Sequence, residues 1–205
     1  MGRRLLVRSS AAAALALATC LAARATASAE APLAIDTARV TIAGTSNIHE
    51  YTASTTKVRV TRAQLGAQAD ANFWENALKP GAVEAFEIAI PAATLASPKE
   101  GLDKNMHKAL KVQEHADITF RLLRFEAGAA GAAKAIGMLQ IAGVEREVAL
   151  DITAKRTGST LTVQGRIDLL MTDYGITPPK AMLGMLKTDP KVTITFETVL
   201  AMPPT

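Results

Sequence analysis

The amino-acid sequence predicts an all-β fold of about eight strands with one short helix, and such a set of strands can pack as a sandwich or close into a barrel. Apolar and polar residues alternate in segment after segment, which is the pattern of strands that bury one face. Helical spacing is clear in one stretch, residues 102–110, where Leu102, Met106 and Leu110 recur at every fourth position. A helix of about three turns is marginal in isolation, so we expect it to lie across or cap a curved sheet.

Turn residues bound the predicted strands, and the strand faces follow from the alternation. The segment 51–62 is rich in Thr and Val but has no strongly apolar face, so we expect it at an edge of the sheet or partly in solvent. After the helix, residues 113–117 form a hinge into a strand on which Ile118, Phe120 and Leu122 share one face. Strands are expected over residues 38–45, 51–62, 83–90, 118–123, 135–142, 144–154, 161–171 and 191–200.

The N-terminal residues 1–29 have the organisation of a secretory signal: three arginines at the start, an apolar run over 11–23 and Ala-Ser-Ala at the end. We therefore expect cleavage after Ala29, a periplasmic or secreted protein, and one domain over residues 30–205. The apolar run is short for a membrane span, so an uncleaved anchor is a minor alternative. Lipidation of Cys20 is a second minor alternative, since the residues before it resemble a lipoprotein box.

Charge and cysteine content exclude two classes of function. Four of the 23 basic residues and none of the 19 acidic residues lie within residues 1–29, so residues 30–205 are formally neutral. Nucleic-acid binding, which depends on a basic surface, is therefore not expected. The single Cys of the chain also lies in the leader, so the mature domain is expected to have neither a disulfide nor thiol chemistry.

The histidines and one formal triad give no catalytic or metal site. His49, His107 and His115 are spread along the chain with no cysteine beside them, so we expect no bound metal. We expect His107 on the solvent side of the helix and the other two in turns. Ser46, His49 and Asp173 could be combined into a hydrolase site, but no nucleophile elbow is present. No cofactor is predicted.

A barrel of about eight strands has room either for side chains or for one small ligand. Aromatic residues make up only 4% of the chain, which favours unfilled space inside. Methionines suit an adaptable cavity, although ordinary core packing is the alternative for each of them. Lys104, Lys108, Lys111 and Lys180 are candidates to meet a polar head group, unless they form a solvated face. The candidate residues of the lumen and mouth are Phe86, Ile88, Met106, Leu110, Ile118, Phe120, Met138, Tyr174, Met182 and Met185.

Four sequence blocks occur in order along most of the mature chain. They are GTSNIHE at residues 44–50, DKNMHKALKVQEHADITF at 103–120, IGMLQIAGV at 136–144 and MTDYGI at 171–176. Together they resemble the YceI-like family, which is lipocalin-like and polyisoprenoid-binding. Two features depart from the family pattern: Ala116-Asp117 stands where Pro is common, and Trp74 lies in a segment that does not align. The resemblance implies an eight-stranded lipocalin-like barrel with a helix near its mouth, a periplasmic or secreted location, and a lumen for an isoprenoid chain or another long amphiphile.

We therefore expect a binding protein without catalytic activity, whose partner is a lipid or an isoprenoid-tailed small molecule and whose helix acts as a lid. Each buried CH₂ contributes roughly 0.8 kcal/mol, and association costs at least about 4 kcal/mol, so a long tail is favoured over a short one. One alternative is a barrel filled by its own side chains that acts as an envelope stress or accessory protein. A hydrolase is the weaker alternative. The sequence carries no signal for an oligomeric state.

Overall fold

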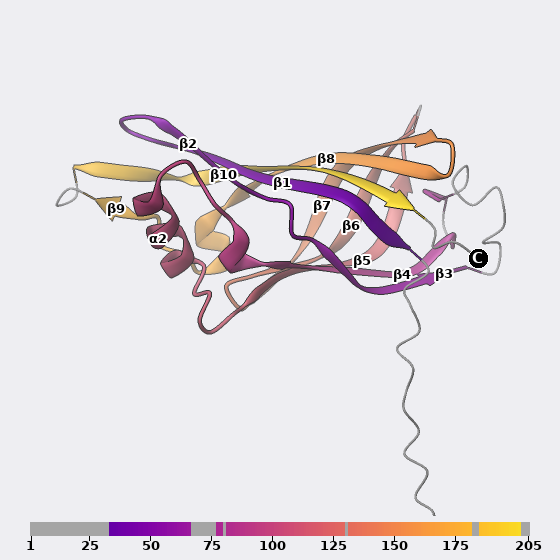
Figure 1. Cartoon of the computed structure of the whole chain (residues 1–205), viewed down its shortest axis with the longest axis horizontal. Helices are drawn as coiled ribbons and strands as arrows, with labels where there is room; N and C mark the ends of the chain where they lie inside the picture. The colour runs from indigo at the N-terminus through magenta and orange to yellow at the C-terminus, as the bar shows by residue number, and fades with distance from the viewer. Residues whose placement is uncertain (1–32, 67–76, 80, 130, 182–184, 202–205) are drawn as a thin grey trace, which may run out of the picture. The chain divides into compact units, whose positions relative to one another are not determined.

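An antiparallel sheet of ten strands curls around an apolar interior in the computed structural model (Figure 1). The structure describes residues 33–66, 77–79, 81–129, 131–181 and 185–201. The predicted leader, residues 1–29, lies outside this part of the chain. Within the described residues, no helix has the length and apolar character needed to cross a membrane.

Nine of the strands form one continuous path in the order β2-β1-β10-β8-β7-β6-β5-β4-β3, and β9 pairs with the start of β10. Within the described residues, all pairs of neighbouring strands are antiparallel. The strands are β1 (Ala34–Ser46), β2 (Glu50–Thr55), β3 (Arg59–Leu65), β4 (Val83–Pro91), β5 (Asp117–Ala127), β6 (Ala132–Ile141), β7 (Val144–Thr157), β8 (Thr160–Leu170), β9 (Lys180–Ala181) and β10 (Leu186–Ala201). The helical elements are η1 (Ala92–Thr94), α2 (Glu100–Ala109) and η2 (Met171–Tyr174).

The all-β prediction is confirmed, and α2 begins and ends within two residues of the predicted helix. The strand number differs, because the single strand predicted over residues 51–62 is wrong. That segment forms β2 and β3, which lie at opposite ends of the strand path. The side chain of Thr55 ends β2: its Oγ1 accepts the N–H of Lys57 at 3.0 Å and lies 2.7 Å from Oγ1 of Thr94. A threonine hydroxyl that binds a nearby backbone group competes with the strand ladder in this way.

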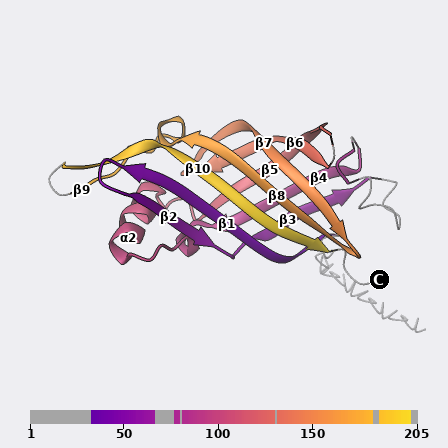
Figure 2. The ribbon, with the colours of Figure 1, turned by 90° about the horizontal axis from the view of Figure 1, so that it is seen from above.

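The free edge of β2 is covered by the segment that follows η1. The Ser54 N–H donates to the Ala96 carbonyl at 2.8 Å, and the Ala96 N–H donates to the Ser54 carbonyl at 3.0 Å. Figures 1 and 2 both place α2, β9 and the β1–β2 turn at one end of the curled sheet, and the β7–β8 turn at the other. Helix α2, the short strand β9 and the β1–β2 turn therefore lie together at one end of the sheet.

Helix α2 is fastened to the segment that follows η1. Asp103 Oδ1 accepts the Ser97 N–H at 2.7 Å, and His107 Nε2 lies 2.8 Å from the carbonyl of Leu95, which is 1% exposed. The expectation that His107 faces solvent is therefore wrong, since its ring bonds the backbone beneath the helix. Acidic residues in the first turn and basic residues in the last turn complement the helix dipole. Lys111 then adopts a φ of 52°, a left-handed conformation that ends the helix.

Candidate ligand cavity

The curled sheet encloses a cavity of about 660 Å³. This volume falls within the range of small-molecule sites, roughly 300–1,000 Å³. Its walls are the inward faces of the strands, because alternate residues of each strand point to the same side of the sheet. The lining includes Val40, Ile42, Phe86, Ile88, Ile90, Ile118, Phe120, Leu139, Ile152, Val163, Ile167, Leu169, Val192, Ile194 and Phe196.

The cavity is elongated along the strands. Lining residues run from Val192 to Leu200 on β10 and from Leu161 to Leu169 on β8. Eight steps at about 3.4 Å each span about 27 Å along a strand, and a tilt of about 40° leaves about 20 Å along the barrel direction. One leaflet of a bilayer, which an ordinary acyl chain fills, has a hydrocarbon depth of about 15 Å. The cavity is therefore long enough for a tail of about the length of a common fatty acyl chain.

Two glycines keep phenylalanine rings against the wall. A Cβ placed on Gly137 would overlap the Phe120 ring, and one placed on Gly165 would overlap the Phe196 ring. Phe196 and Gly165 are direct partners in the β10–β8 register. Each ring lies over a glycine of the neighbouring strand, in the space that a side chain would otherwise fill. If the rings instead projected into the lumen, they would block it, so the two glycines help to keep the cavity open.

Polar groups collect at the end of the cavity beside α2, whereas the far end is lined by buried residues such as Leu33, Leu161 and Leu200. This end, which we call the mouth, is where an amphiphile would leave its polar group. The polar and charged lining residues of the mouth are Ser46, His49, Glu50, Thr52, Ser97, Lys99, Asn105, Lys180 and Thr188.

Two tyrosines bring hydroxyl groups into the mouth. Tyr174 lines the cavity from η2 and is 3% exposed, and its hydroxyl has no hydrogen-bond partner within the described part of the chain. Burial raises the pKa of Tyr174 to about 12, so the group remains a neutral hydroxyl that can donate and accept. Burial, with the nearby Asp189 carboxylate, also raises the pKa of Tyr51. Neither hydroxyl is suited to ionisation at neutral pH.

Seven of the ten predicted lumen and mouth residues line this one cavity: Phe86, Ile88, Met106, Leu110, Ile118, Phe120 and Tyr174. Their role in ligand binding stays a prediction. Lys180 also lines the mouth, whereas Lys104, Lys108 and Lys111 are exposed outside the lining.

Met138 and Met185 are placed elsewhere, and Met182 lies outside the described residues. Met138 stands between Arg121 and Glu147 in the strand register, on the outer face, because its neighbour Leu139 faces the interior. Met185 is 66% exposed in the turn before β10. Neither Met138 nor Met185 is among the lining residues of the cavity.

Sequence reasoning missed several mouth residues that lie beside the apolar stripe of α2. Asn105 and Gly101 are four positions apart and adjoin Met106 and Leu102, so a wider helical stripe would have included them. Tyr51 was missed because its strand has no strong apolar face.

The formal hydrolase triad is not assembled as a catalytic site. Ser46 Oγ donates to the His49 carbonyl at 2.8 Å and accepts the His49 N–H at 3.1 Å, so this hydroxyl closes the β1–β2 turn. Within the residues that the structure describes, no three His, Cys, Asp or Glu side chains gather as a metal site.

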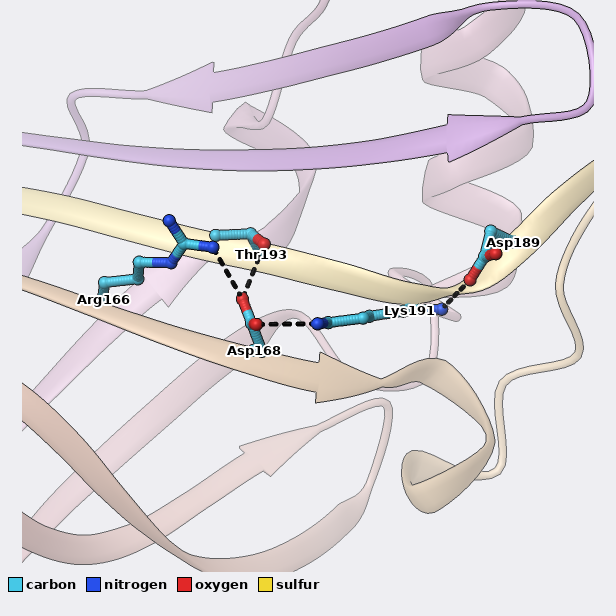
Figure 3. Close-up of polar contacts among 5 residues, drawn as sticks. All are labelled: Arg166, Asp168, Asp189, Lys191 and Thr193. Carbon is cyan, nitrogen blue, oxygen red and sulfur yellow. Dashed lines mark hydrogen bonds and ion pairs between the residues drawn. The ribbon is translucent and has the colours of Figure 1, made fainter.

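The outer face of the sheet carries ion pairs between neighbouring strands, of which the group around Asp168 is the densest (Figure 3). Asp168 Oδ2 lies 2.8 Å from Lys191 Nζ, and Asp168 Oδ1 accepts from Thr193 Oγ1 at 2.7 Å and from Arg166 Nη2 at 3.3 Å. The hydrogen bonds from Lys191 and Thr193 hold the pKa of Asp168 well below its usual value. These contacts join β8 to the half of β10 that reaches the mouth.

Replacement of Asp168 by Asn is expected to give a stability defect that depends on pH. The folded pKa is lowered, so the unfolded chain protonates first as the pH falls. The charged contacts then stabilise the fold above a pH of about 4 and lose this effect below it. The melting temperature of Asp168→Asn should lie below that of the wild type at pH 7, and the gap should narrow between pH 4 and pH 2. Added salt should narrow it as well, because the group is exposed. An equal gap at pH 7 and pH 2 would contradict this account.

Comparisons with known proteins agree with this architecture. The family model of the YceI-like domain matches residues 27–200. The crystal structure of Burkholderia cenocepacia BcnA is similar with a TM-score of 0.63 at 12% identity, over 80% of this chain and 96% of that chain. A polyisoprenoid binding domain from Saccharophagus degradans, implicated in plant cell wall breakdown, gives a TM-score of 0.61 at 12% identity, over 85% and 100% of the two chains.

The YceI protein of Campylobacter jejuni gives a TM-score of 0.52 at 15% identity, over 73% of this chain and 85% of that chain. At these identities the solved structures show a shared fold. No curated protein matches the chain. The family model covers most of the chain and confirms the resemblance carried by the four sequence blocks. The chain belongs to the YceI-like domain family.

Proposed function

We propose that this protein binds a long-chain amphiphile, with a polyisoprenoid tail as the first candidate, and that it does so without catalysis. The observation that carries the proposal is the cavity: about 660 Å³ of space with apolar lining residues from β1, β4, β5, β6, β7, β8 and β10, and polar groups at one end. The similar structure from Saccharophagus degradans is a polyisoprenoid binding domain, which suggests the class of tail.

The energetics of burial favour a long tail over a short one. Ten buried carbons contribute roughly 8 kcal/mol and twenty contribute roughly 16 kcal/mol. Association costs about 4–15 kcal/mol, so a ten-carbon tail is near break-even and a twenty-carbon tail binds well. The cavity needs no strong polar contact to retain such a ligand.

The tail-length dependence of binding tests this proposal. Geraniol, farnesol, geranylgeraniol and a longer polyprenol form a series with one kind of head group and increasing tails. Affinity should rise at least about tenfold for each isoprene unit added up to geranylgeraniol, and then level off as the tail outgrows the cavity. The measurement is displacement of a fluorescent apolar probe. Equal affinity for geraniol and geranylgeraniol would contradict the proposal, as would the absence of displacement by any member.

The mouth is proposed to hold the polar head, with the Tyr174 hydroxyl as its hydrogen-bond partner. A buried hydroxyl without a partner costs about 1–3 kcal/mol, so ligand-free Tyr174→Phe should be as stable as the wild type or more stable by about 1 kcal/mol. Its affinity for geranylgeraniol should fall about fivefold, which is the value of one hydrogen bond. Affinity for a hydrocarbon of the same length without the hydroxyl should not change. An equal loss for both ligands would contradict this role of Tyr174.

The proposal includes export to the periplasm or the exterior, with cleavage after Ala29 and a mature domain over residues 30–205. An apolar molecule needs a shielded carrier in an aqueous compartment, and the predicted leader fits that need. Lipidation of Cys20 is the alternative. The intact mass of the purified protein separates the two, because a lipidated chain would begin at Cys20 and carry acyl groups.

A further inference from the structure

Two exposed apolar side chains lie on neighbouring turns at the mouth end. Ile48, in the β1–β2 turn, is 59% exposed, and Met185, in the turn before β10, is 66% exposed. They are the most exposed large hydrophobic residues within the described part of the chain. Neither side chain lines the cavity, so packing of the interior does not account for their apolar character.

The two turns are held together by Asn47. Its Nδ2 donates to the Met185 carbonyl at 2.8 Å, and its Oδ1 accepts the Lys187 N–H at 2.8 Å. A third bond runs from the Asn47 N–H to the Lys187 carbonyl at 3.1 Å. These three hydrogen bonds hold the turn that carries Ile48 beside the turn that carries Met185.

A stripe of basic residues lies at the same end. Lys104 and Lys108 are exposed four positions apart on one face of α2, and Lys111 is exposed in the turn that follows the helix. None of the three has an ion-pair partner among the residues the structure describes. By contrast, several basic residues on the sheet wall are paired, as Lys134 is with Asp151 and Lys191 with Asp168. Figures 1 and 2 place α2 beside the β1–β2 turn at this end.

We propose that the mouth end docks on an anionic lipid bilayer. Ile48 and Met185 would enter the interfacial region, and the lysine stripe would meet the anionic head groups. Apolar residues next to lysines are the combination by which proteins lie on such surfaces. This inference rests on the proposed function, because docking at the mouth places the cavity against the membrane from which the amphiphile is taken.

Vesicle flotation tests the docking surface. Each protein is expressed as the full chain in a Gram-negative host, purified from the periplasm, and checked by intact mass so that all variants share one N-terminus. The wild type should float with vesicles of equal parts phosphatidylglycerol and phosphatidylcholine, and much less with phosphatidylcholine alone. The double variant Ile48→Asp, Met185→Asp should bind at least about tenfold more weakly. Replacing the three lysines by Gln should weaken binding by about fivefold for each lysine.

Leu123→Asp is the matched control, since Leu123 is also a large exposed apolar residue, 43% exposed, but lies at an irregularity of β5 on the wall. It should bind vesicles like the wild type. A wild type that does not float with anionic vesicles, or a Leu123→Asp variant that loses as much as the double variant, would overturn the docking proposal. Binding of geranylgeraniol is measured for the same proteins without vesicles. If the wild type binds geranylgeraniol but does not float with vesicles, the docking proposal fails and the proposed function stands. If the wild type does not bind geranylgeraniol, the proposed function itself is contradicted.

Discussion

Leu139→Asp should abolish ligand binding, whereas Met138→Asp, one residue earlier on β6, should leave it nearly unchanged. Leu139 is 8% exposed and lines the cavity, while Met138 stands between Arg121 and Glu147 on the outer face. An unpaired carboxylate in the apolar lining costs several kcal/mol, or becomes protonated with a raised pKa. We expect a loss of about 3–5 kcal/mol in the free energy of unfolding and at least a hundredfold loss of affinity for Leu139→Asp.

Met138→Asp tests the strand register with the same chemical change. Its carboxylate would lie on the outer face between Arg121 and Glu147, so that attraction to one partner offsets repulsion from the other, and the melting temperature should change little. The measurements are thermal unfolding and displacement of a fluorescent probe by geranylgeraniol. If Leu139→Asp proves too unstable to assay, Leu139→Gln provides a neutral polar group at the same place. Equal losses from Met138→Asp and Leu139→Asp would contradict the assignment of the two faces.

Gly165→Ala should destabilise the fold by about 1–3 kcal/mol, because the new Cβ overlaps the Phe196 ring. The ring can leave this position only by moving toward the lumen, so ligand capacity should fall along with stability. The same Cβ would also approach the Asp151 carbonyl oxygen at 3.0 Å, and that part of the cost is independent of the ring.

A double-mutant cycle with Phe196→Ala separates the two contributions. In the Phe196→Ala background the ring is absent, so Gly165→Ala should cost less by about 1–2 kcal/mol. Urea unfolding of the four proteins gives this coupling energy. Additive effects of the two changes would show that the ring does not rest on the glycine, and would contradict this explanation of the open lumen.

Much of the wall could be predicted because alternation is a local signal. On β10 and β8 most of the alternate residues on one face are apolar, and these apolar residues line the cavity. Apolar character alone assigns Met138 to the lumen, although alternation places it on the face opposite Leu139 and Ile141, between Arg121 and Glu147. Apolar character alone was too weak a criterion; alternation with Leu139 and Ile141 was the better one.

Other features depend on contacts between residues far apart in the chain. The Thr55 hydroxyl ends β2 before β3 begins by bonding the Lys57 N–H and contacting Thr94. No local sequence pattern predicts the contact with Thr94. His107 was expected in solvent because its helix position is polar, but it bonds the Leu95 carbonyl across a loop. Asn47 and Lys187 meet across about 140 residues of chain. Such pairs require the fold before they can be recognised.

Mass spectrometry of the protein purified without detergent from its own host tests the central claim most directly. The protein would be weighed intact under native conditions, and its organic extract would then be analysed. We expect one equivalent of a long-chain adduct on a chain that begins at Glu30, with an isoprenoid-tailed or similar amphiphile in the extract. A mass equal to the bare chain, with nothing in the extract, would contradict the carrier function and favour a barrel that acts through its surface.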